Sequence, residues 1–292
     1  MLPESVKSKV ISFLTRKGER PAEILSQHAV SGGSINEAYH LKTSRGSFFL
    51  KYNDASRYPG MFEKEARGLQ LLAAPDALDV PEVLLAGEAG NYAFLLLEYV
   101  EEAGTRRNFW DDFAKGLAAL HQQKADRFGL DHDNYMGSLY QHNNFHDDWT
   151  EFFIEERLER QLKLARDHNK AGHSETTRFE RLYRRLNELI PATKPSLIHG
   201  DLWSGNFMVN SEGRACLIDP AVYYGHPETD LAMSTLFGGF SEKFYDAYNT
   251  YHPLEKGWRD RMDIYNLYPL MVHVNLFGGG YLGSVQRILR RF

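Results

Sequence analysis

The sequence has few of the features that mark secreted, membrane-spanning or metal-clustered proteins. Cys216 is the single cysteine among 292 residues, so no intramolecular disulfide and no cysteine-based zinc cluster can form. The longest apolar run, residues 92–97, is far shorter than the roughly 18 residues that a membrane span needs. Residues 1–10 also lack the apolar stretch of a signal peptide. We therefore expect a cytoplasmic protein with no membrane partner.

An excess of positive charge is also missing. The 34 lysines and arginines are outnumbered by 39 aspartates and glutamates, which gives a net charge of −5. A broadly basic surface for nucleic acid is thus excluded, although a local basic pocket for a phosphate group is compatible with this composition. With 42% hydrophobic and 25% charged residues and no repeats, the chain has ordinary globular composition. Its length corresponds to two domains or lobes at about 150 residues each.

The hydrophobic pattern changes near residue 101. Before this point it predicts a small antiparallel sheet with one inserted helix, with strands over residues 38–42, 47–52, 80–86 and 92–100 and the helix over 62–72. After it, helices are predicted near residues 110–120, 149–165, 179–190 and 258–277, with short strands at 207–209 and 215–218. We therefore predict an α+β protein with an N-terminal lobe (residues 1–100) and a larger, mainly helical C-terminal lobe (residues 101–292).

The strongest motif runs from His199 through Asp201 to Asn206, and Asp219 follows at the end of an apolar strand. A kinase catalytic loop has the same order: a catalytic Asp, four residues, a metal-binding Asn, and then a second metal-binding Asp. Asp201 can accept the proton of an acceptor hydroxyl, and Asn206 and Asp219 offer the hard oxygen ligands that Mg²⁺ prefers. Two other readings are a polar turn between strands and metal-dependent hydrolysis through His199, Asp201, Asp219 and His226.

A second signal is Lys51, which lies in an apolar predicted strand, with Glu65 fourteen residues later on the predicted helix. The two match the strand Lys and helix Glu that hold the α- and β-phosphates of ATP in kinases. Glu63 is the rival partner, but Glu65 is adjacent to the apolar stripe of the helix and is better directed inward. Lys51 and Glu65 are therefore predicted to bind nucleotide phosphates.

Two weaker signals also point to a nucleotide. Gly32, Gly33 and Ser34 lie between predicted strands, where glycines allow close approach of backbone to phosphate. The chain has no GxxxxGK[ST] motif, which argues against a P-loop NTPase. Residues Glu98, Tyr99 and Val100 form a linker at the predicted lobe boundary, where backbone groups can pair with an adenine edge.

Together these motifs resemble the fructosamine kinase (ketosamine-3-kinase) family, within the protein-kinase-like, aminoglycoside-phosphotransferase-like superfamily. The resemblance spans nearly the whole chain, and its most specific blocks are HGDLWSGN at residues 199–206 and DPAVYYGHPETDLAM at 219–233. It implies a bilobal fold, Mg²⁺ and ATP, and phosphorylation of the sugar 3-hydroxyl of ketosamines, a small-molecule substrate whose amine is then released. By position it implies Asp201 as the base, Asn206 and Asp219 as magnesium ligands, and Lys51 with Glu65 as the phosphate clamp. Trp203 is expected to stack on the sugar or its amine substituent, or else to be a packing aromatic.

The chain departs from these patterns at two positions. Ser34 stands where many family members carry a cysteine, so a redox switch through that loop is not expected. Gly200 replaces the Arg that precedes the catalytic Asp in protein kinases, and we expect no phosphorylation-controlled activation loop. Two alternatives remain open: a kinase of this fold for an aminoglycoside, choline or homoserine, and a non-catalytic nucleotide-binding protein.

Overall fold

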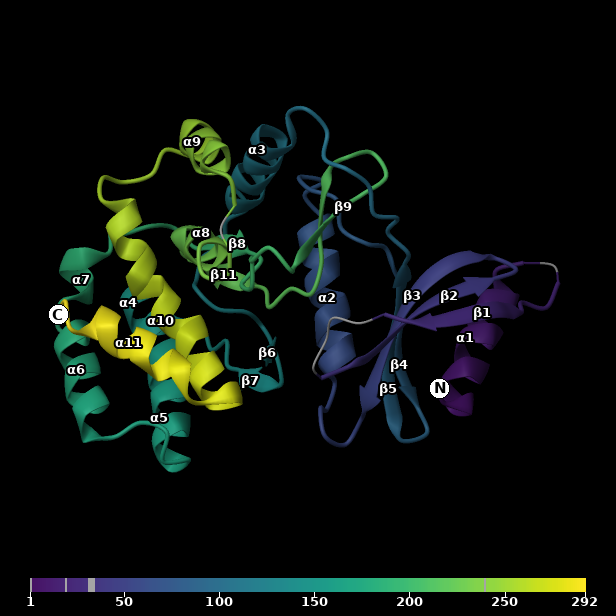
Figure 1. The fold of residues 1–292 in the computed structure, drawn as a ribbon, viewed down its shortest axis with the longest axis horizontal. Coiled ribbons are helices and arrows are strands. Elements are labelled where there is room, and N and C mark those ends of the chain that lie inside the picture. Colours follow the sequence, from purple (N-terminus) through teal and green to yellow (C-terminus); the bar gives the residue numbers. More distant parts are fainter. Residues whose placement is uncertain (1, 19, 31–34, 239) are drawn as a thin grey trace. The chain divides into compact units, whose positions relative to one another are not determined.

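The structure is a computed structural model that describes residues 2–18, 20–30, 35–238 and 240–292 (Figure 1). By its internal contacts the chain divides into two compact units. The first contains Met1–Arg106 together with Met208–Asp219, and the second contains Arg107–Phe207 together with Pro220–Phe292. The segment 208–219 therefore groups with the N-terminal residues, although it lies more than a hundred residues beyond the change of pattern near residue 101.

The first unit is built on a five-stranded antiparallel sheet with strand order β1-β2-β3-β5-β4. Its strands are β1 (Ile24–Ala29), β2 (Glu37–Thr43), β3 (Gly46–Asp54), β4 (Val83–Ala89) and β5 (Tyr92–Glu98). A short pair, β9 (Phe207–Val209) and β10 (Ala215–Leu217), completes the strands of this unit. The predicted antiparallel sheet with one inserted helix is confirmed.

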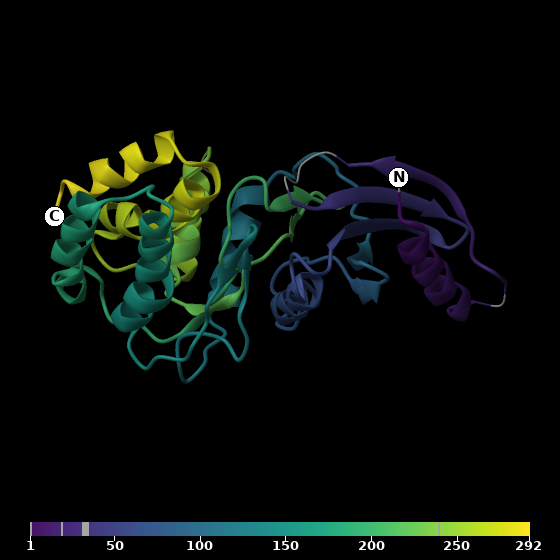
Figure 2. The same ribbon diagram turned by 90° about the horizontal axis from the view of Figure 1, so that it is seen from below.

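Two helices cover opposite faces of this sheet. Helix α1 (Glu4–Arg16) packs Val6 and Val10 against Leu50 and Leu96, and Figure 2 shows it alongside the strands. Helix α2 (Met61–Ala73) packs its apolar side against the neighbouring strand positions, including Leu95. Because successive side chains of a strand point to opposite faces, Leu95 and Leu96 belong to different cores. The position of Lys51 in β3, opposite Leu95, directs its side chain to the α2 face.

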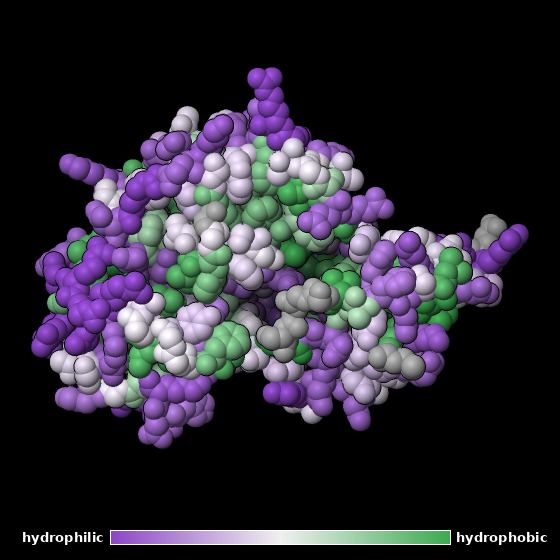
Figure 3. Space-filling view, viewed as in Figure 1, coloured by the Kyte–Doolittle hydropathy of each residue, from purple (hydrophilic) through white to green (hydrophobic). Residues whose placement is uncertain are grey.

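The second unit is mainly helical. Its longer helices are α3 (Phe109–His121), α5 (Glu159–Asp167), α6 (His173–Tyr183), α9 (Glu242–Tyr251), α10 (Trp258–Phe277) and α11 (Gly280–Leu289). Its short helices are α4 (Trp149–Phe152), α7 (Leu186–Leu189) and α8 (Glu228–Ser234), and its two strand pairs are β6 (Asn134–Met136) with β7 (Leu139–Gln141) and β8 (Ser196–Ile198) with β11 (Tyr223–Gly225). None of the described helices combines the length and the apolar character of a membrane span. Hydrophilic side chains are spread over the face in Figure 3.

The helix predicted over residues 149–165 differs from an uninterrupted α-helix. Its middle turn, η1 (Phe153–Leu158), is a π-helix that contains the fully buried Arg157. The Arg157 guanidinium donates to the carbonyl oxygen of His142 at 2.5 Å and to Oδ1 of Asn143 at 2.7 Å, and it lies 3.9 Å from the ring centre of Tyr223. Hydrophobic periodicity does not show such a local change of winding, because the extra residue per turn is stabilised by these tertiary partners.

The helix predicted over residues 179–190 is likewise divided. Helix α6 starts earlier, at His173, and ends at Tyr183, and a turn then leads into the short helix α7. Pro191 follows that helix, as the sequence predicts for a helix end. The predicted helix over 258–277 is confirmed as α10 and accommodates Pro269 in its interior.

Two histidines in the second unit, the buried His226 and the partly buried His252, make stability depend on pH. Burial and the nearby Arg261 lower the pKa of His226 to about 3, and burial lowers the pKa of His252 to about 4. In the unfolded chain a histidine has a pKa of about 6.5, so the unfolded state binds more protons as the pH falls below that value. These groups therefore favour the folded state above pH 6.5, and this contribution is lost progressively towards pH 4.

We predict that the free energy of unfolding falls between pH 6.5 and pH 4.5, with each of the two histidines contributing a slope of up to about 1.4 kcal/mol per pH unit. Urea denaturation at several pH values would measure the slope in the wild type and in His226→Gln. Because His226→Gln removes one of the two protonation sites, its free energy of unfolding should fall less steeply with falling pH, by up to about 1.4 kcal/mol per pH unit. This difference in slope is expected whatever the stability of the variant at pH 7. Parallel profiles for the two proteins would contradict the prediction.

Candidate active site

Lys51 lies between two carboxylates in the first unit. Its Nζ atom is 2.8 Å from Oε1 of Glu65 on α2, and it also forms an ion pair with Asp219, which follows β10. The Lys51 side chain is only 8% exposed. Burial alone would lower the pKa of Lys51, but Asp219 and Glu65 outweigh it and raise the pKa above its usual value. Burial also raises the pKa of Glu65, and Lys51 opposes that rise.

This arrangement brings together three of the residues singled out in the sequence. Glu65 is the partner of Lys51, as expected, whereas Glu63 is exposed. Asp219 has a φ of 53°, in the left-handed region that few non-glycine residues adopt. Strained residues of this kind concentrate at functional sites, where the surrounding structure stabilises them. Their roles as a phosphate clamp and a metal ligand stay predictions.

The loop that follows β8 contains the predicted base and is attached to α8 of the second unit. Both carboxylate oxygens of the fully buried Asp230 accept backbone hydrogen bonds, from the N–H of His199 at 2.7 Å and from that of Gly200 at 2.9 Å. Nε2 of the buried His121 lies 3.2 Å from the same carboxylate, and its Nδ1 lies 2.6 Å from the hydroxyl of Tyr248. Asp230 thus fixes the start of the loop.

Gly200 is required by the space around it. Its φ is 82°, and a Cβ atom at this position would lie 2.1 Å from the carbonyl oxygen of Ala221. The backbone N–H of Ala221 in turn donates to the carbonyl oxygen of His199 at 2.9 Å. A side chain cannot fit between these two segments, which explains why the Arg of the kinase template is absent here.

Within the loop, Asn206 faces Asp201. The Nδ2 group of Asn206 donates to the Asp201 carbonyl oxygen at 2.8 Å and to Oδ2 of the Asp201 carboxylate at 2.9 Å. The amide nitrogen is thereby directed at Asp201, and the amide oxygen lies on the other side of the group. Trp203 has its indole against the backbone of Gly205, where an added Cβ would come within 2.4 Å of the ring. Asp201, Trp203 and Asn206 thus form one compact turn.

The linker residues Glu98, Tyr99 and Val100 line a cavity of about 500 Å³ in the first unit. The Glu98 carboxylate accepts from the N–H of Glu82 at 3.3 Å, and the Tyr99 ring stacks on His40 at 3.7 Å. The charged residues that line this cavity are Asp76, Asp79, Glu98, Glu101, Glu212 and Arg214. Because these carboxylates repel the phosphates of a nucleotide, the lining of the cavity does not by itself support nucleotide binding. Adenine recognition by the linker backbone stays a prediction.

The predicted glycine loop, Gly32, Gly33 and Ser34, lies outside the described residues.

Sequence reasoning did not identify a set of polar residues that supports the segment after Asp219. Gln141 donates to the carbonyl oxygen of Ala221 at 3.1 Å, and Asn134 donates to that of Val222 at 2.8 Å. The hydroxyl of Tyr268 donates to Oε1 of Gln141 at 2.7 Å. These residues come from the β6-β7 hairpin and from α10. These polar residues are far apart in the sequence and form no motif or periodic pattern, so only the folded structure shows that they support this segment.

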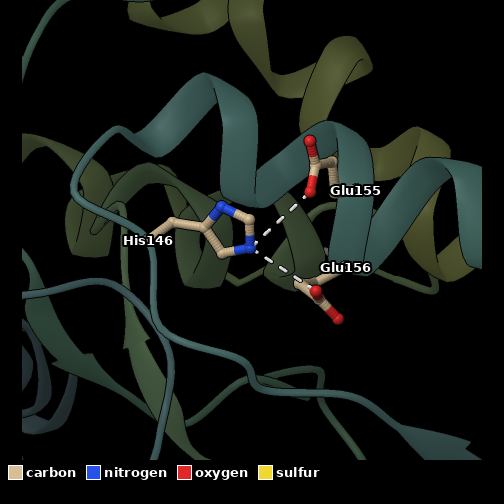
Figure 4. A group of neighbouring side chains, drawn as sticks. All are labelled: His146, Glu155 and Glu156. Carbon is tan, nitrogen blue, oxygen red and sulfur yellow. Dashed lines mark hydrogen bonds and ion pairs between the residues drawn. The ribbon is translucent and has the colours of Figure 1, made fainter.

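Metal-dependent hydrolysis, one of the alternatives considered, would need a cluster of metal ligands. Among the described residues, one group of three potential ligands lies together, His146 with Glu155 and Glu156 (Figure 4). Nε2 of His146 is 3.4 Å from Glu156 and 4.0 Å from Glu155, and Arg160 lies 3.5 Å from Glu156. An arginine at that distance balances the carboxylate charge. This group is better explained as an ion-pair cluster than as a cation site.

The chain has a kinase-like α+β fold. An aminoglycoside phosphotransferase, APH(4)-Ia, superposes with a TM-score of 0.64 over 97% of this chain and 98% of its own, at 16% identity, which reflects the shared fold alone. The predicted kinase-like α+β fold is confirmed.

Within this fold class, the chain belongs to the fructosamine kinase family, whose family model matches residues 6–292. A protein named "probable ketoamine kinase" from Enterococcus faecium is 43% identical over 90% of this chain and 94% of its own. The chloroplastic protein-ribulosamine 3-kinase of Arabidopsis thaliana is 38% identical over 92% of this chain and 83% of its own. A solved structure from Thermobifida fusca, named "putative fructosamine-3-kinase", has a TM-score of 0.88 at 32% identity over 99% of this chain and 98% of its own. The resemblance stated from the motifs is thus confirmed.

We predict that Gly200→Ala destabilises the second unit by at least about 2 kcal/mol, because the added methyl group meets a backbone carbonyl and the φ angle is unfavourable for alanine. Gly104→Ala is the matched control, since a Cβ there meets no atom within 4 Å. Denaturant titration of both variants would measure the difference. Equal stability of the two variants would contradict the role assigned to Gly200.

Proposed function

We propose that this chain uses ATP to phosphorylate the sugar 3-hydroxyl of ketosamines, after which the unstable phosphorylated adduct releases its amine. One observation carries the proposal: the HGDLWSGN loop of a fructosamine kinase family member contains an Asp and an Asn in hydrogen-bond contact, held to the fold through Asp230. The substrate is a small-molecule or protein-bound glycated amine. Deglycation is the expected consequence.

Asp201 acts as the base in this proposal. Its carboxylate accepts the proton of the acceptor hydroxyl while the hydroxyl oxygen bonds to the γ-phosphorus and the bond from that phosphorus to the bridging oxygen of ADP breaks. Because the transition state of phosphoryl transfer is loose, a weak base suffices and orientation of the hydroxyl matters more than basicity. The hydrogen bond from Nδ2 of Asn206 to Oδ2 supports this role by limiting the orientations of the Asp201 carboxylate.

Lys51, which Glu65 holds in position through their ion pair, binds the α- and β-phosphates in this proposal. An ammonium group has three donors, and the contacts with Glu65 and Asp219 use two of them. The third donor is available to a phosphate oxygen. Burial strengthens this interaction, since a charge that is screened little by water attracts phosphate more strongly. Backbone groups of Gly32, Gly33 and Ser34 are proposed to cover the phosphates, and those of Glu98, Tyr99 and Val100 to pair with adenine.

We propose that Mg²⁺ takes the amide oxygen of Asn206 and the carboxylate of Asp219 as ligands. Both are hard oxygen donors, and the direction of the Asn206 amide nitrogen towards Asp201 leaves its oxygen on the opposite side. When bound, the ion neutralises charge on the phosphate oxygens. The residues present therefore fit this cofactor.

The proposal predicts transfer of phosphate from ATP to a synthetic ribulosamine or fructosamine in the presence of Mg²⁺, seen as a new sugar-phosphate signal by phosphorus NMR. Asp201→Asn should bind ATP and lose at least about a hundredfold in kcat, since it cannot accept the proton. Chelation of Mg²⁺ should abolish the signal. ATP binding by the wild type without transfer to either ketosamine would refute the proposed substrate and favour another acceptor.

Lys51→Met should raise KM for ATP or lower kcat by about tenfold or more, because the phosphates lose their buried cation. Lys42→Met, which removes an exposed lysine from the neighbouring strand, serves as control and should leave both constants within about twofold. Glu65→Gln provides a second test that keeps Lys51 in place. Steady-state kinetics with ATP as the varied substrate distinguish these cases. Identical constants in all four proteins would remove Lys51 and Glu65 from the nucleotide site.

A further inference from the structure

Five aromatic rings of the second unit form a continuous series that begins in the catalytic loop. We call the series the aromatic strip, and its members are Trp203, Phe237, His273, Phe277 and Tyr281. Ring centres are 5.8 Å apart for Trp203 and Phe237, and 4.7 Å apart for Phe237 and His273. His273 is in turn 4.9 Å from Tyr281 and 5.5 Å from Phe277. The strip thus joins the turn after β8, the segment after α8, the C-terminal end of α10 and the start of α11.

The aromatic strip is not part of the hydrophobic core. Phe277 is 59% exposed, and the other four residues are partly exposed. Next to Phe277, at Gly278, Gly279 and Gly280, an added Cβ would meet no atom within 4 Å, so the backbone beside the strip is uncovered. Apolar aromatic surface that remains in water and is continuous over several residues is typical of binding sites.

The aromatic strip begins next to the proposed base. The backbone N–H of Trp203 donates to the carbonyl oxygen of Asp201 at 3.2 Å, and the same turn contains Asn206. The first ring of the aromatic strip therefore belongs to the same turn as the proposed base, and the other rings continue from it to the exposed ring of Phe277.

His273 is suited to a position in such a site. Its Nδ1 donates to the carbonyl oxygen of Pro269 at 2.7 Å, so Nε2 is left as an acceptor in the neutral ring. Burial lowers the pKa of His273, while the bond to Pro269 opposes this, and the net shift is downwards. The ring is therefore neutral at pH 7, and none of the five side chains of the strip repels a cation.

We propose that the aromatic strip is the subsite for the amine-derived part of the ketosamine. This inference rests on the proposed function. It adds a binding surface for the amine-derived part of the substrate and makes that part the one by which the enzyme selects among ketosamines. In a ketosamine the amine nitrogen is two carbons from the carbon that bears the 3-hydroxyl, and it is protonated at neutral pH. A protonated amine is attracted to the faces of Trp203 and Phe237, and an apolar or aromatic substituent stacks on Phe277 and Tyr281.

The test compares two ketosamines of the same sugar, one made from phenethylamine and one from methylamine. The quantity of interest is the ratio of their kcat/KM values, since a common sugar cancels all effects on the chemical step. The wild type should prefer the phenethylamine adduct by about tenfold, because an additional ring is stacked. Phe277→Ala and Tyr281→Ala should each lower that ratio by about threefold or more.

Two further proteins control for indirect effects. Phe145→Ala removes an aromatic ring that is also exposed but lies outside the aromatic strip, and it should leave the ratio unchanged. Phe277→Tyr keeps an aromatic ring and should retain most of the wild-type ratio. A merely structural role for Phe277 would change both substrates equally and leave the ratio as it is.

The results separate this inference from the proposed function. Turnover of both ketosamines with a wild-type ratio near one, or an unchanged ratio in Phe277→Ala and Tyr281→Ala, would overturn the subsite and leave the kinase activity intact. Absence of turnover with both ketosamines would instead refute the proposed function, and the proposed occupant of the strip with it.

Discussion

The candidate catalytic loop depends on one buried carboxylate. Asp230 accepts the backbone N–H groups of both His199 and Gly200, and His121 contacts it from α3. A buried carboxylate with several donors is strongly favoured, whereas the same backbone groups without it would be left unpaired in the core. The position of Asp201 follows from this attachment, and Gly200 is the residue that lets the chain pass so close to Ala221.

The two units contribute different parts of the chemistry. The first holds a buried cation, Lys51, between two carboxylates, and in the proposed reaction this cation binds the phosphates of the nucleotide. The second holds the hydrogen-bonded pair Asp201 and Asn206 and, beside it, partly exposed aromatic rings. In the proposed reaction, a buried charge in a rigid setting binds ATP, which is the same for every substrate, and the aromatic surface binds an acceptor whose amine can vary.

Much of the fold and of the site could be predicted because the signals are local. The alternation in β3 and β5 and the stripe on α2 indicate the sheet and its helix, and the spacing from Lys51 to Glu65 identifies an ion pair that the structure contains. The π-helical turn at Arg157 and the support of Ala221 by Gln141 could not be predicted. Both arise from contacts between segments far apart in the chain, for which a single sequence has no periodic signal.

The sequence by itself determined the secondary-structure pattern, the family and the identities of the candidate catalytic residues, because hydrophobic spacing and short motifs are properties of neighbouring residues. Only the tertiary structure decided that Asp219 joins Glu65 at Lys51, that Asp230 accepts from two backbone N–H groups of the loop, and that five aromatic residues between positions 203 and 281 form one strip. The physical reason is that burial and hydrogen-bond satisfaction are settled among elements that meet only when the chain has folded.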